Sequence, residues 1–116
     1  MRHLNPRDEL LVEGLRDSIS LAWLHDYFEY DFTSDGKAQE RTLDMIGDLV
    51  GQGFFVVGTP ASFGFHQWLM PLEEALEEIK TAYVDHFDHR ESWAETIALY
   101  QTAKGKQLGA KLCRGR

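Results

Sequence analysis

The apolar positions in the first half of the chain repeat with the period of an α-helix. Asn5 followed by Pro6 indicates a helix start, because asparagine caps free amide groups and proline fits the first helical turn. A corner is expected near residues 18–20, and a second helix is expected over Leu21–Phe28. The apolar face of these segments consists of Leu10, Leu11, Leu15, Ser18, Ile19 and Ala22.

A third helix is predicted after the turn-forming cluster Asp31–Gly36. It begins near Lys37, and the glycines of residues 51–53 are a natural stop. Its buried stripe is marked by Leu43, Ile46 and Val50.

After residue 53 the pattern changes to that of strands. Phe54–Val57 is rich in β-branched and aromatic residues, and Gly58–Pro60 is typical of a turn. The apolar run Phe63–Met70 is expected to return as the distorted second arm of a hairpin. A third strand is predicted over Thr96–Gln101.

The clearest amphipathic helix is predicted to start at Pro71 and to run from Leu72 to about Phe87. Its apolar face is Leu72, Ala75, Leu76, Ile79, Ala82, Tyr83 and Phe87. The chain ends in a short basic segment, about residues 104–116, which we expect to be a frayed terminus.

This order of elements predicts an α+β fold in one domain over residues 1–116. It comprises three N-terminal helices, a small antiparallel sheet and an inserted amphipathic helix. A hydrophobic content of 43% in 116 residues can form a core, and one cysteine, Cys113, excludes an intrachain disulfide. We see neither a secretory signal nor an apolar run of about 18 residues, so a cytoplasmic protein without a membrane span is expected.

The motifs give no sign of an enzyme. The ten glycines have no phosphate-binding spacing, and Ser62 lacks the preceding glycine of a hydrolase elbow. We therefore expect no catalytic residue and no cofactor. The close pair His86 and His89 lies among carboxylates, but a solvated helix end is a better interpretation than a metal site. A metal-dependent activity at this pair remains a third hypothesis.

Charge is distributed unevenly along the chain, whose formal net charge is −7. Residues 1–103 contain seven Lys and Arg against 19 Asp and Glu, a charge of −12, whereas residues 104–116 carry +5. The acids of the fourth helix stack at i, i+4 spacing and continue beyond it, which predicts a surface for a basic partner. These candidate partner-binding acids are Glu73, Glu74, Glu77, Glu78, Asp85 and Asp88. We expect Trp68 to anchor this interface and assign Trp23 to the core.

The element order, together with the ending Leu-Tyr-Gln-Thr-Ala-Lys-Gly-Lys-Gln-Leu-Gly, resembles winged-helix regulators over roughly residues 8–112. The resemblance implies a winged-helix-like fold in which the third helix reads DNA. The alternative DNA-binding residues would be Lys37, Arg41, Lys104 and Lys106. Residues 37–52 carry a net charge of −1, so nucleic acid is not the expected partner.

The segment Gly64-Phe-His-Gln-Trp-Leu-Met-Pro-Leu-Glu-Glu-Ala-Leu76 is similar to one found in small acidic actinobacterial-type proteins. That resemblance implies an immunity partner of a secreted toxin, which inhibits by covering the toxin's active site. Together with the acidic charge, it makes a non-catalytic immunity protein for a basic toxin, for example a nuclease, the leading hypothesis. A winged-helix transcriptional regulator is the alternative.

Overall fold

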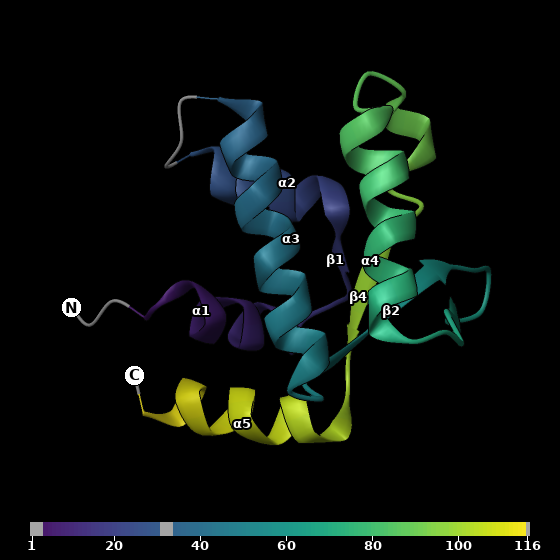
Figure 1. The fold of residues 1–116 in the computed structure, drawn as a ribbon. Coiled ribbons are helices and arrows are strands. Elements are labelled where there is room, and N and C mark those ends of the chain that lie inside the picture. The colour runs from purple at the N-terminus through teal and green to yellow at the C-terminus, as the bar shows by residue number, and fades with distance from the viewer. Residues whose placement is uncertain (1–3, 31–33, 116) are drawn as a thin grey trace.

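The computed structural model describes residues 4–30 and 34–115 and confirms the predicted α+β class (Figure 1). Residues 31–33 of the predicted turn, and Arg116 of the basic segment, lie outside the described residues. The helices are α1 (Pro6–Glu13), α2 (Leu21–Glu29), α3 (Asp35–Gly51), α4 (Leu72–Lys80) and α5 (Ala103–Arg114). The strands are β1 (Ile19–Ser20), β2 (Phe55–Pro60), β3 (Phe65–Gln67) and β4 (Ala98–Gln101).

Side-chain caps explain where several helices begin. The side chain of Asn5 accepts a hydrogen bond from the Asp8 amide at 2.9 Å, which confirms the predicted start of α1. Ser20, Ser34 and Thr102 cap α2, α3 and α5 in the same way. The first helix ends at Glu13, and the corner predicted near residues 18–20 contains the short strand β1.

The sheet is antiparallel, with the strand order β1-β4-β2-β3. Leu99 of β4 pairs with Ile19 on one side and with Val57 on the other. The predicted hairpin is present, but Gly58–Pro60 continues β2 and is not the turn. The turn follows Pro60 and includes Gly64 at φ 88°, a conformation that favours glycine.

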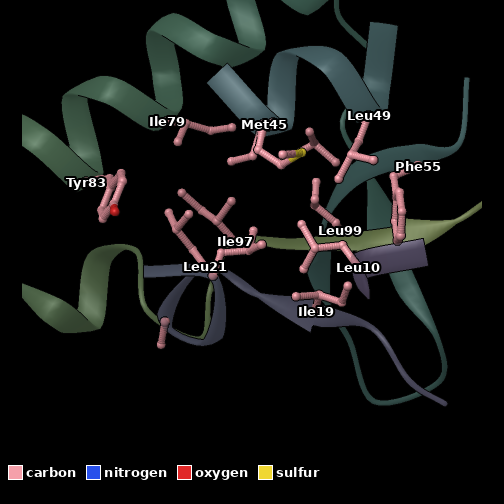
Figure 2. Close-up of a cluster of buried hydrophobic side chains, with 14 of the residues drawn as sticks. Leu10, Ile19, Leu21, Met45, Leu49, Phe55, Ile79, Tyr83, Ile97 and Leu99 are labelled. Atoms are coloured by element: carbon pink, nitrogen blue, oxygen red, sulfur yellow. The ribbon is translucent and has the colours of Figure 1, made fainter. Parts of the chain in front are cut away.

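The core lies between the sheet and helices α2, α3 and α4. Figure 2 shows Met45 and Leu49 of α3 reaching toward Leu99 of the sheet, with Ile79 and Tyr83 at the side where α4 packs. The predicted fourth helix is shorter than expected: α4 ends at Lys80, and a π-helical turn, Thr81–Asp85, extends it.

One tryptophan is placed differently from expectation. Trp23, expected in the core, is 37% exposed and stacks on Tyr27 with ring centroids 5.4 Å apart. The core-facing side of α2 is formed by Leu21, Leu24 and Phe28. Trp93 is fully buried: its ring stacks on Phe87, and its indole N–H donates to the Phe87 carbonyl oxygen.

The basic segment is not a frayed terminus, because most of it forms α5, which packs along α1 (Figure 1). Gly105 and Gly109 permit this packing. A Cβ atom at Gly109 would lie 2.5 Å from the Leu11 carbonyl oxygen, and one at Gly105 would collide with the Phe54 carbonyl. Sequence periodicity could not reveal a helix whose docking depends on distant carbonyl groups.

Candidate functional site: an acidic groove on α4

Four glutamates of α4 line one open groove of about 760 Å³, here called the acidic groove. They are Glu73, Glu74, Glu77 and Glu78, and the remaining lining residues are Thr81, Ala82, His86 and Ser92. The sequence-predicted acids of the helix are therefore brought together around one concave surface. A concave, carboxylate-lined surface suits a cationic ligand or side chain.

The amphipathic pattern of α4 places its glutamates on the solvent-exposed side of the helix. Ala75 and Ile79 are buried against the core, so the opposite side of the helix faces solvent. Glu73 and Glu74 lie in the first turn, where the helix dipole favours negative charge, whereas Glu77 and Glu78 lie beyond it. Among the described residues, no Lys or Arg nitrogen lies within 4.0 Å of these four carboxylates.

The far end of the groove is built by the π-helical turn. The Thr81 hydroxyl donates to the Glu77 carbonyl at 3.0 Å, and His86 Nδ1 lies 2.9 Å from the Thr81 carbonyl oxygen. A carbonyl can only accept, so Nδ1 carries the proton in this contact. This contact orients the His86 ring toward the groove. The ring stacks on that of His89, with centroids 5.9 Å apart.

The other predicted interface residues do not line the groove. Asp85 and Asp88 are exposed on the segment after α4. Trp68 is half-buried, because its amide donates to Val57 and its indole N–H donates to the Thr59 hydroxyl at 2.9 Å. The next residue, Leu69, is 90% exposed. The irregular arm therefore turns Trp68 toward the protein and leaves Leu69 as the apolar contact surface beside α4.

The hairpin also presents an apolar residue that the sequence interpretation did not select. Phe63, between β2 and β3, is 98% exposed. Its position directly before Gly64 in a glycine-containing turn is a signal that could have identified it, because a large side chain at a hairpin tip has no neighbours to cover it.

The four alternative DNA-binding residues do not form one cluster. Lys37 and Arg41 lie in the first turns of α3, and the Arg41 guanidinium packs over the Phe28 ring. The Lys104 ammonium donates to the Gln52 carbonyl at 2.8 Å, beyond the other end of α3. Arg41 and Gln52 are eleven positions apart, or about 16 Å along the axis. Lys106 is exposed on α5.

A second groove, of about 600 Å³, lies along α5 and has the opposite charge. Its lining is Phe54, Lys104, Gln107, Leu108, Ala110, Lys111 and Arg114. We call it the basic groove. Its cations have internal partners, because Lys104 also lies over the Phe54 ring at 5.2 Å, and Lys111 and Arg114 are at the negative end of the α5 dipole.

A buried polar cluster lies away from both grooves. His25 is 2% exposed, and its ring contacts Tyr83, Asp35 and Glu29. Burial, reinforced by nearby acids, raises the pKa of the Tyr83 phenol well above its usual range, so the phenol keeps its proton. Within the described part of the chain, His25, Glu29 and Asp35 form the group of side chains that could hold a metal ion, whereas His86 and His89 form none.

The sequence interpretation missed this cluster. A usable signal was present, because His25 lies in the predicted helix Leu21–Phe28 and Glu29 follows four residues later, a spacing that shares one face if the helix continues by one residue.

Comparison of the chain with protein-family models, curated proteins and solved structures finds no match. No helix within residues 4–30 and 34–115 has the length and apolar character needed to cross a membrane.

Proposed function

We propose that this protein is a non-catalytic binding protein that uses the acidic groove to cover a basic surface of another protein. The specific form of the proposal is a cytoplasmic immunity protein that blocks the active site of a cognate basic toxin. The observation that carries it is the gathering of four carboxylates on one concave face with no cationic partner among the described residues.

The repulsion within the groove supports this proposal. Glu73 and Glu77, and likewise Glu74 and Glu78, are like-charge pairs at i, i+4 spacing, each of which costs about 0.2–0.5 kcal/mol. The two like-charge pairs therefore lower the stability of the isolated domain. A partner that brings Lys or Arg side chains into the groove would relieve this repulsion, and the relief would strengthen binding.

Electrostatics also supports the choice of a basic toxin. The segment from α4 through the 3₁₀ turn Arg90–Ser92 contains seven acids and two cations, so its field extends beyond the groove itself. Opposite charges steer encounter and can raise association rates to about 10⁸ M⁻¹s⁻¹ or more at low salt. Exposed Leu69 would supply an apolar contact that opposite charge alone does not give.

Co-purification with the product of the neighbouring gene, and rescue of cells from its toxicity, test the proposal. The informative variant is the quadruple change E73Q/E74Q/E77Q/E78Q. A matched control, E40Q/D44N/D48N/E95Q, removes the same charge from exposed positions outside the groove. We expect the groove variant to lose binding and protection and the control to keep both. Failure to find a partner, or equal behaviour of the two variants, would reject the proposal.

The cations of α5 support one alternative, a winged-helix DNA-binding regulator. This helix carries Lys104, Lys106, Lys111 and Arg114 and no acid. The resemblance assigns DNA reading to α3, but this helix has two cations against four acids, and its net negative charge opposes contact with phosphates. It predicts a DNA complex that weakens as salt increases, so absence of an electrophoretic shift at about 50 mM salt would remove it.

A further inference from the structure

The buried cluster at the junction of α2 and α3 combines a histidine with two carboxylates. His25 and Glu29 lie one turn apart on α2, and Asp35 is the first residue of α3. His25 Nε2 is 3.3 Å from Asp35 Oδ1 and 3.4 Å from Glu29 Oε2. The histidine is 2% exposed, whereas the two carboxylates are 51% and 54% exposed, so one side of the cluster is open to solvent.

A hydrogen bond on the inner side fixes the orientation of the His25 ring. His25 Nδ1 lies 2.5 Å from the hydroxyl oxygen of Tyr83, a side chain that is itself fully buried. A neutral imidazole has one protonated and one unprotonated nitrogen, so either group can be the donor in this contact.

The outer nitrogen, Nε2, faces two acceptors, Asp35 and Glu29. When the imidazole proton is on Nδ1, Nε2 presents a lone pair, and an ionised carboxylate cannot satisfy it because a carboxylate only accepts. In that tautomer one nitrogen and two carboxylate oxygens face one place, which is a donor set suited to a metal ion.

The distances fit a metal ion. Zinc binds imidazole nitrogen at about 2.0–2.1 Å and carboxylate oxygen at about 2.0–2.2 Å, so neighbouring ligand atoms of a tetrahedron lie about 3.3–3.5 Å apart. The two separations from Nε2 fall in this range. The ligand atoms of all three residues lie within 4.8 Å of one another, and the half-exposed carboxylates have room to close around an ion.

We propose that His25 Nε2, Glu29 and Asp35 bind a divalent transition-metal ion of the zinc type. The fourth coordination position faces solvent and would be taken by water. Tyr83 is a positioning residue, because it holds the imidazole by Nδ1, as the outer partner of a ligating histidine does. The site is separate from the acidic groove, whose lining contains none of these residues.

Titration of the full chain with Zn²⁺, and with Co²⁺ as a spectroscopic probe, tests this site. Every protein would carry C113S, which removes the exposed thiol as a competing ligand. We expect one ion per chain and a tetrahedral Co²⁺ spectrum. Isothermal titration calorimetry measures the stoichiometry.

Three variants locate the ion. E29Q/D35N removes two ligands at half-exposed positions and should abolish saturable binding, with folding checked by circular dichroism. E73Q/E77Q is the matched control, because it removes two acids at i, i+4 spacing outside the His25 cluster, and it should bind the ion as the parent does. Y83F should weaken binding by about 10–100-fold, as loss of an outer partner does.

Each remaining outcome contradicts the proposal. If the parent takes up no ion, the cluster is held by hydrogen bonds alone and the proposal is rejected. If E29Q/D35N keeps binding while H86Q/H89Q loses it, the ion belongs to the exposed histidine pair. The metal result is independent of the proposed immunity function, because the groove variants should retain the ion and E29Q/D35N should retain the protein partner.

Discussion

The acidic groove on α4 is lined by four glutamates and the basic groove on α5 by three cations, and the two grooves differ in how those charges are compensated. Lys104 is held by the Gln52 carbonyl and the Phe54 ring, and Lys111 and Arg114 oppose the dipole of their own helix. Glu77 and Glu78 have neither kind of support. Charge count alone does not identify a binding surface. Charge that the fold itself leaves uncompensated is the better indicator.

The largest effect is expected from removing the support behind the acidic groove. Trp93→Ala deletes a fully buried ring that stacks on Phe87, so the free energy of unfolding should fall by about 3–5 kcal/mol. Trp23→Ala, at a 37% exposed position, is the matched control and should cost less than about 1 kcal/mol. Chemical denaturation measures both. Equal losses would mean that Trp93 does not support this side of the core.

The next effect concerns the attachment of α5. Gly105→Ala places a methyl group against the Phe54 carbonyl, and we expect a loss of about 1–3 kcal/mol in unfolding free energy. At Gly36 in α3, an added Cβ would meet no atom of the described residues outside its own helix within 4 Å, so Gly36→Ala should instead stabilise the protein by up to about 1 kcal/mol. If Gly105→Ala were as stable as the parent, α5 would not be docked as described.

A smaller effect tests whether the helix dipole of α5 stabilises the cations of the basic groove. Lys111→Gln and Arg114→Gln each remove a cation from the last turn of α5, where it opposes the negative end of the helix dipole. Each change should lower the unfolding free energy by about 0.3–1 kcal/mol at low salt, measured by thermal denaturation. A gain in stability would show that these cations, like the α4 glutamates, repel one another.

The smallest effect has the opposite sign. E77Q/E78Q relieves two like-charge pairs and should stabilise the isolated protein by about 0.2–0.5 kcal/mol per pair. The same change should weaken binding of the basic partner. Paired denaturation and binding measurements decide the comparison, since a stability loss together with unchanged binding would place the four glutamates in a structural role.

Local signals in the sequence predicted much of this fold. Asn5 and Pro6 marked the start of α1, and the 3.6-residue period of α4 placed its glutamates on one face. Such features depend on residues within a few positions of one another. The four glutamates that line the acidic groove were foreseen for the same reason, whereas its other lining residues, Thr81, Ala82, His86 and Ser92, were not.

Long-range packing explains what could not be predicted. The docking of Gly109 requires the carbonyl of Leu11, and the burial of Trp93 requires Phe87 to fold back over it after the π-helical turn. The His25 cluster depends on where α3 begins relative to α2 and on Tyr83 from beyond α4. The periodicity of a single segment does not predict these long-range contacts.

The strand order has a consequence for how the protein is made. The strand β4 lies between β1 and β2, yet it is the last strand to be synthesised. Ile19 and Val57 both pair with Leu99, so neither pairing can form until β4 has been synthesised. Pairing between such distant segments is slow because a long loop must be closed first. On the ribosome, the sheet can therefore be completed only after β4 has emerged.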